Sequence, residues 1–176
     1  MLRAINLGSH NRISMPRLEQ LFRDLGHRHI STYVQSGNVV FSATTENQDA
    51  LRSAIERRIT ADLGLKVTVL LRSAVEFAAL AAKNPFVRRG ADPAGLHVTF
   101  LACPADLPLV AAVSPDVGQP DAFEITGRDI FLNCPNGYGR SKLNNAFWER
   151  RLRQPATTRN WKTVTALRDM TKVAEA

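Results

Sequence analysis

The sequence has few cysteines and no long apolar run. Its two cysteines are fewer than the disulfide framework of a small secreted protein requires. No apolar run approaches the roughly 18 residues that a membrane-spanning helix needs, and residues 1–8 are too short for a signal peptide. We therefore expect a soluble, cytoplasmic protein with reduced thiols and no membrane partner.

The motifs of several enzyme classes are absent as well. The four histidines lack the spacing of a metal-binding motif. There is no G-x-G-x-x-G, and residues 136–142 lack the spacer and the Lys-Ser order of a phosphate-binding P-loop. Ser36 lacks the G-x-S-x-G setting of a catalytic serine. We therefore expect no metal and no cofactor, and we assign no catalytic residue.

What is present is ordinary globular composition with an uneven charge. The 176 residues are 44% hydrophobic and 22% charged, which suits one compact domain or two small lobes. The net charge is +7, with five basic against two acidic side chains in residues 1–36, nine against eleven in residues 37–138, and nine against three in residues 139–176. Positive charge at the ends favours anionic partners. The expected basic patch comprises Arg140, Lys142, Arg150, Arg151, Arg153 and Lys162.

Hydrophobic periodicity predicts an α+β fold. In the first half, strands and helices alternate as β-α-β-β-α-β, which is typical of a ferredoxin-like lobe. The strands are expected at residues 2–6, 30–35, 38–42 and 66–71, and the helices at 14–25 and 51–63. Ser14 is the expected cap of the first helix, and Ser36-Gly37 is the expected hairpin turn. Because the first strand starts abruptly, we expect the true N-terminus a few residues upstream.

The second half repeats this pattern with a helix in place of the last strand. A helix opened by a capping box at Ser73 leads to a polar connector. A strand at 96–102, a helix at 106–113, a hairpin at 122–133 and helices at 141–152 and 160–173 follow. We therefore predict two ferredoxin-like (βαββα) lobes with a C-terminal helix: residues 1–84, a connector at 85–95, and residues 96–176. One compact domain is the alternative.

Four groups of residues resemble a known family. They are Arg3-Ala4-Ile5-Asn6-Leu7-Gly8 with Asn11-Arg12 and Met15, Tyr33 to Phe41, Asn84-Pro85-Phe86, and Thr157-Thr158-Arg159-Asn160-Trp161 with Thr163. In this order they resemble the domain of unknown function (DUF) family numbered 1697. The family pattern has Gly-Gly where this chain has Gly8-Ser9. The resemblance implies paired ferredoxin-like units, and it implies no activity and no catalytic residue.

Polar residues in three segments form the candidate ligand site. The first segment leads into a helix, whose free amides and macrodipole attract anions. The second is the hairpin, whose amide side chains can contact a polar ligand, although turns favour Asn and Ser by themselves. The third contains Arg159, which needs a negative partner if it lies at a helix start. The candidate residues are Arg3, Asn6, Gly8, Arg12, Gln35, Ser36, Asn38, Arg159, Asn160 and Trp161.

Two functions from different classes stay open at this point. The spread of positive charge favours a non-catalytic binding protein for an anionic partner, with nucleic acid as the leading candidate. The concentration of polar residues in three segments favours an enzyme or sensor for a small phosphate- or carboxylate-bearing ligand. The first reading needs an open basic face, and the second needs the three segments to meet in one pocket. The sequence does not indicate an oligomeric state.

Overall fold

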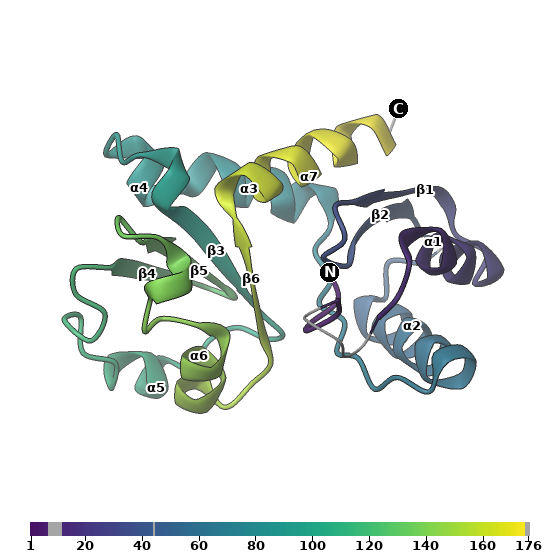
Figure 1. Ribbon diagram of the computed structural model, residues 1–176, viewed down its shortest axis with the longest axis horizontal. Coiled ribbons are helices and arrows are strands. Elements are labelled where there is room, and N and C mark those ends of the chain that lie inside the picture. Colours follow the sequence, from purple (N-terminus) through teal and green to yellow (C-terminus); the bar gives the residue numbers. More distant parts are fainter. Residues whose placement is uncertain (7–11, 44, 175–176) are drawn as a thin grey trace. The chain divides into compact units, whose positions relative to one another are not determined.

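The computed structural model describes residues 1–6, 12–43 and 45–174 of the chain. Contacts divide it into two compact units (Figure 1). Unit 1 comprises Met1–Ala74 and Ala166–Ala176, and unit 2 comprises Val75–Thr165. The fold is mixed α+β with two antiparallel sheets, as expected from the sequence.

Unit 1 contains a two-stranded hairpin and two long helices. Helix α1 (Met15–Asp24) begins after Ser14, whose side chain accepts a hydrogen bond from the Arg17 N–H, as predicted. Strands β1 (Arg28–Tyr33) and β2 (Asn38–Ser42) pair antiparallel around the predicted turn. Helix α2 (Gln48–Leu63) ends at Gly64, which has the left-handed backbone of a helix C-cap.

The expected strands at residues 2–6 and 66–71 are reduced to one isolated bridge, between Leu2 and Val69. The Leu70 N–H donates to the Met1 carbonyl, and the Arg3 N–H donates to the Thr68 carbonyl. On its other side, the Leu2 N–H donates to the Gly37 carbonyl at 2.8 Å. Left-handed backbone at Ala4 and Asn6 bends the chain directly after this pairing, so a longer strand cannot form.

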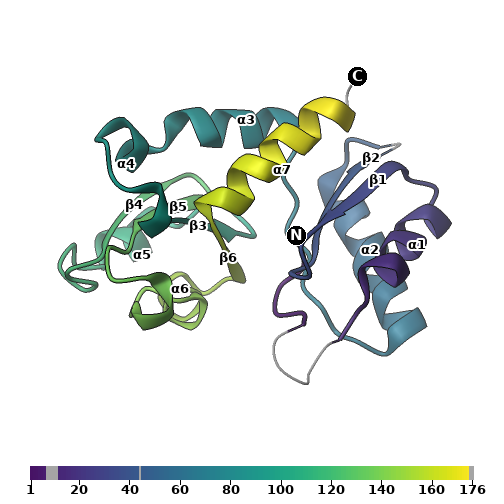
Figure 2. The same cartoon turned by 45° about the horizontal axis from the view of Figure 1, so that its top comes forward.

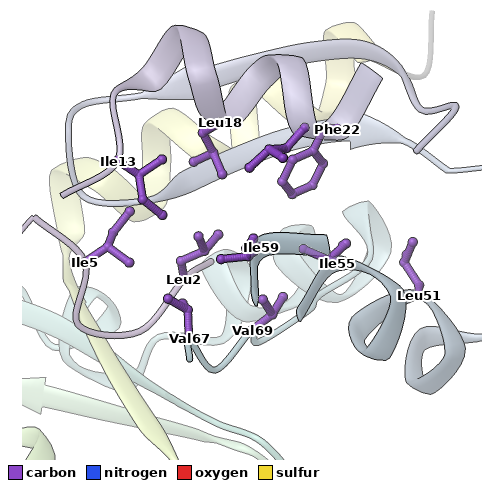
Figure 3. Packing of buried hydrophobic residues seen from close by; sticks show 11 residues of the cluster. Leu2, Ile5, Ile13, Leu18, Phe22, Leu51, Ile55, Ile59, Val67 and Val69 are labelled. Atoms are coloured by element: carbon purple, nitrogen blue, oxygen red, sulfur yellow. The ribbon is translucent and has the colours of Figure 1, made fainter. Parts of the chain in front are cut away.

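The core of unit 1 lies between α1, α2 and the paired chain segments. Figure 3 shows Leu18 and Phe22 of α1 pointing toward Ile55 and Ile59 of α2. Leu2 and Val69 lie in the same cluster, together with Ile5, Ile13, Leu21, Leu51 and Val67. The helical spacing of the apolar residues in both helices, read from the sequence, gives this buried face.

Unit 2 contains a four-stranded antiparallel sheet in the order β4-β5-β3-β6. Its strands are β3 (Leu96–Leu101), β4 (Ala122–Thr126), β5 (Asp129–Asn133) and β6 (Ala156–Asn160). Its helices are α3 (Ala74–Lys83), α4 (Pro85–Arg88), α5 (Leu107–Ala111) and α6 (Asn145–Leu152), with 3₁₀ turns η1 (Pro93–Gly95) and η2 (Tyr138–Arg140). Helix α7 (Trp161–Ala174) begins in unit 2 and continues into unit 1.

Helices cover both faces of the unit 2 sheet. Helices α3 and α4 lie on one face and α5 and α6 on the other (Figures 1 and 2). Successive side chains of a strand point to opposite faces of the sheet, so each strand contributes to the packing on both faces. Phe100 stacks on Phe77 of α3, whereas Ile130 and Leu132 pack in one cluster with Trp148 of α6.

Strand β6 corrects the predicted order of elements in the second half. We expected a helix in place of the last strand, but residues 156–160 form a strand that pairs with residues 97–101 of β3. Helix α6 also begins later than expected, because Asn144 rather than Ser141 caps it. The Ser141 hydroxyl instead accepts a hydrogen bond from the Leu143 N–H.

The predicted connector, residues 85–95, contains α4 and η1 and belongs to unit 2. The predicted boundary between two lobes at these residues stays a prediction. Within the described ranges, no helix is both long and apolar enough to cross a membrane.

Candidate functional site

Asn6 joins the start of the chain to the hairpin of unit 1. Its Nδ2 donates to the carbonyls of Ile13 and Gln35, both at 2.9 Å, and its Oδ1 accepts from the Ile13 N–H at 2.8 Å. Its backbone is left-handed, at a φ of 54°, which Asn tolerates better than most residues. The structure therefore brings two of the three predicted segments together through one side chain.

Polar groups of the hairpin turn form hydrogen bonds with one another. Asn38 is fully buried, and its Nδ2 donates to the Tyr33 carbonyl and to Ser36 Oγ at 2.7 Å. Gln35 is exposed, and its side chain makes no hydrogen bond within the described ranges. Val34 beside it is 54% exposed with a φ of 48°, a conformation that a β-branched residue rarely adopts. Gln35 is thus the side chain of the turn that can reach a partner.

The cations expected near the start of α1 differ in their surroundings. Arg17 is committed to Asp62 at 3.2 Å. Arg3 is half-buried and Arg12 is exposed. Gly8, the remaining candidate in this segment, lies outside the described residues.

A polar network lies between β3, β6 and α6 in unit 2. Thr158 Oγ1 is its centre: it donates to Asn145 Oδ1 at 2.6 Å and accepts from the Tyr138 hydroxyl at 3.0 Å. A hydroxyl has one proton, so the third contact, to Thr99 Oγ1 at 2.7 Å, must be donated by Thr99. Thr99 is fully buried. The sequence carries no separate signal for this network, because Thr is also a common strand former.

Burial shifts the acid–base properties of the groups around this network. It raises the pKa of Tyr138, an effect that the hydrogen bond to Thr158 partly offsets. It lowers the pKa of His97, whose ring stacks on Tyr138 with the ring centroids 4.8 Å apart. It also raises the pKa of the fully buried Cys134 thiol to about 11. These groups are therefore neutral near pH 7, and Cys134 is not a reactive thiol.

Arg159 lies in strand β6, directly before Asn160, so the cation precedes the start of α7, and its role as a ligand contact stays a prediction. It pairs with Val98 across the sheet, and its Nη1 donates to Thr157 Oγ1 and to the Thr158 carbonyl. The residue is half-buried, and its guanidinium is desolvated enough to lower its pKa to about 10. Asn160 caps α7 by accepting from the Thr163 N–H at 2.8 Å, and Trp161 is buried.

Exposed cations surround α6. Arg140 and Lys142 precede the helix, Arg150 and Arg151 lie in its last turn, and Arg153 directly follows it. None of these five forms an ion pair with any described residue, and neither does Lys162 at the start of α7. The described residues hold no group of three or more His, Cys, Asp or Glu side chains suited to a metal ion.

Comparison with protein families gives a match over residues 1–131, to the model described as "Protein of unknown function (DUF1697)". The chain belongs to the DUF1697 family. A solved structure similar to this DUF1697 protein is that of a conserved bacterial protein, SP0830, from Streptococcus pneumoniae. The two are 23% identical with a TM-score of 0.76, and the match covers 97% of this chain and 96% of that one. This likeness supports the fold alone. No curated protein matches the sequence.

The candidate residues of this DUF1697 protein thus fall into two sets. Arg3, Asn6, Arg12, Gln35, Ser36 and Asn38 belong to unit 1, and Arg159, Asn160, Trp161 and the basic patch belong to unit 2. Within unit 1, Asn6 links the first two predicted segments. A ligand contact at any of these residues stays a prediction.

Proposed function

We propose that this protein is a non-catalytic binding protein for nucleic acid, which it contacts with the exposed cations around α6. The observation that carries the proposal is the contrast between two sets of basic residues. In unit 1, Arg17, Arg23 and Arg52 each form an ion pair with a carboxylate. The five cations around α6 form none with described residues. Their charge is therefore available to phosphate groups.

Local structure presents these cations to solvent. In the segment before α6, exposed Arg140 and Lys142 alternate with buried Ser141 and Leu143. Trp148 Nε1 anchors this segment by donating to the Leu143 carbonyl at 3.0 Å. The two cations therefore point outward from a backbone that is held in place.

A structural explanation accounts for only part of this charge. The helix macrodipole favours cations in the last turn, which suits Arg150 and Arg151. It gives no reason for cations before the helix, where Arg140 and Lys142 lie. Positive charge at both ends of α6 is better explained by a polyanion that extends along the helix.

The test compares two triple variants with the same loss of charge. The first replaces Arg140, Lys142 and Arg150 with Gln, and the control replaces the ion-paired Arg17, Arg23 and Arg52 with Gln. We expect the first to weaken binding to a short duplex by about tenfold or more at low salt, and the control to change it by about threefold or less. Equal losses in both variants would mean that net charge, and not this surface, attracts the nucleic acid.

A second candidate is an enzyme or sensor for a small phosphate- or carboxylate-bearing ligand. The observation in its favour is the desolvated guanidinium of the half-buried Arg159, because an arginine shielded from water can bind an anion in a bidentate geometry. The test is a thermal-shift screen with nucleotides and sugar phosphates, since a ligand of the native state raises its melting temperature. Arg159→Lys should weaken any stabilisation that the wild type shows.

We also infer a ferredoxin-like plan for each unit and a cytoplasmic location. In unit 2, the chain order β3-α5-β4-β5-α6-β6 and the sheet order β4-β5-β3-β6 support this plan. In unit 1, its support is the position of residues 1–3 between residues 68–70 and the hairpin turn. The cytoplasmic location rests on the low cysteine content of the sequence.

A further inference from the structure

A groove of about 620 Å³ runs along unit 1, between α2 and residues 66–68. Glu56, Arg57, Thr60 and Ala61 of the helix line one wall, and Lys66, Val67 and Thr68 line the other. None of these residues belongs to the surface around α6.

The second wall of this groove is an open backbone edge. Residues 68 and 70 direct their backbone groups toward residues 1–3, with which they are hydrogen-bonded. Backbone groups alternate in direction along an extended chain, so those of Val67 and Val69 point the opposite way. The Val69 N–H donates to Glu56 Oε1 at 2.8 Å. The N–H and C=O of Val67 have no hydrogen-bond partner within the described ranges.

Two cations flank this edge. Arg57 and Lys66 are exposed, and neither forms an ion pair with a described residue. The carboxylate in the groove, Glu56, is occupied by the Val69 N–H. The side chains of Val67 and Val69 are buried in the core of unit 1, so the edge is fixed in place.

We propose that this groove binds an extended, acidic peptide segment of a partner protein, which pairs with the Val67 edge as an added strand. Main-chain hydrogen bonds to Val67 provide affinity in this mode of recognition, and side-chain contacts provide specificity. Acidic side chains of the peptide lie beside Arg57 and Lys66. Glu56 limits the length of the added strand, because it already accepts a hydrogen bond from the Val69 N–H, the next N–H on this edge.

The test uses a fluorescent peptide of about ten residues in which Glu and Thr alternate, a length typical of a strand with short flanks. Binding is measured by anisotropy with the full chain. We expect Arg57→Glu combined with Lys66→Glu to weaken binding about tenfold or more, since reversed charges repel the ligand. The matched control, Arg28→Glu with Lys83→Glu, reverses two exposed cations elsewhere and should leave binding within about threefold.

Peptides methylated on alternate backbone amides test the main-chain pairing. Because one edge of a strand faces the protein, methylation of one alternating set of amides should abolish binding, and methylation of the other set should not. Equal effects of the two methylated peptides would overturn the proposal, as would equal losses in the two protein variants.

Two further outcomes would also overturn it. One is a short oligonucleotide that binds in the same groove while the peptide fails to bind. The other is a concentration-dependent dimer of the chain that the Arg57/Lys66 variant abolishes, which would make a second copy the occupant. The groove belongs to unit 1 and the proposed nucleic-acid surface to unit 2, so each proposal can fail without the other.

Discussion

Replacing Thr158 with Val removes the centre of the polar network in unit 2. Valine has nearly the same shape and suits a strand, so the change deletes a hydroxyl group with little effect on packing. Three partners lose their bond to Thr158: the hydroxyls of Thr99 and Tyr138 and the Oδ1 of Asn145. Thr99 is fully buried, and Tyr138 is largely desolvated. Their proton donors would be left without a partner.

The expected cost follows from the number of groups left unsatisfied. A buried donor or acceptor without a partner costs about 1–3 kcal/mol, and partial rescue by water lowers the cost for Tyr138 and Asn145. We therefore expect Thr158→Val to lower the free energy of unfolding by about 2–4 kcal/mol. Tyr138→Phe removes one bond and leaves Thr158 with two others, so it should cost about 1 kcal/mol.

Urea unfolding followed by tryptophan fluorescence provides the assay. Both tryptophans, Trp148 and Trp161, lie within residues 75–165, so their emission reports on unit 2. The double variant Thr99→Val with Thr158→Val should cost less than the sum of the single changes, because removing both hydroxyls leaves neither one unpaired. If Thr158→Val costs no more than Tyr138→Phe, Thr158 is not the centre of the network and the hydrogen-bond assignment is wrong.

Three other outcomes test unit 1. Asn6→Gly keeps the left-handed backbone but loses the side chain, so exchange of the Ile13 amide should become faster by about tenfold or more; an unchanged rate would mean that Asn6 does not hold this segment. Gly37→Ala should lower the free energy of unfolding by about 2 kcal/mol or more, because the new Cβ would lie 2.6 Å from Ile5 Cδ1. Gly64→Ala is the control: its Cβ would meet nothing within 4 Å, and it should cost about 1 kcal/mol. Equal costs would refute the contact between Gly37 and Ile5. Burial lowers the pKa of His27 below its ordinary 6.5, so the folded state binds fewer protons and stability should fall as the pH drops through about 6.5 and below. His27→Phe should reduce that dependence, and an unaltered pH profile would assign it to other groups.

Local signals in the sequence predicted several elements of this fold. The Ser14 cap and the apolar spacing after it gave α1, and Ser36-Gly37 gave the hairpin turn. These elements depend on residues close together in the chain. Strand β6 was missed because Asn160 and Trp161 signal a helix start, and its strand conformation depends on pairing with β3, about 60 residues away.

The same limit applies to the candidate sites. Net charge was readable from the sequence, but the ion pairs Arg17–Asp62 and Arg58–Asp24 join helices far apart in the chain. Only the structure therefore shows which cations are neutralised by a carboxylate. The groove beside Val67 was equally hidden, because its edge exists only after residues 1–3 pair with residues 68–70.

The salt dependence of duplex DNA binding tests the proposed nucleic-acid surface most directly. Each phosphate contact contributes about −0.9 to the slope of log K against log salt concentration. Five cations around α6 therefore predict a slope of about −4 to −5 for the wild-type protein, and loss of Arg140, Lys142 and Arg150 should bring it to about −2. The control that lacks the ion-paired arginines of unit 1 should keep the wild-type slope. No binding at low salt, or one slope shared by all three proteins, would contradict the proposal.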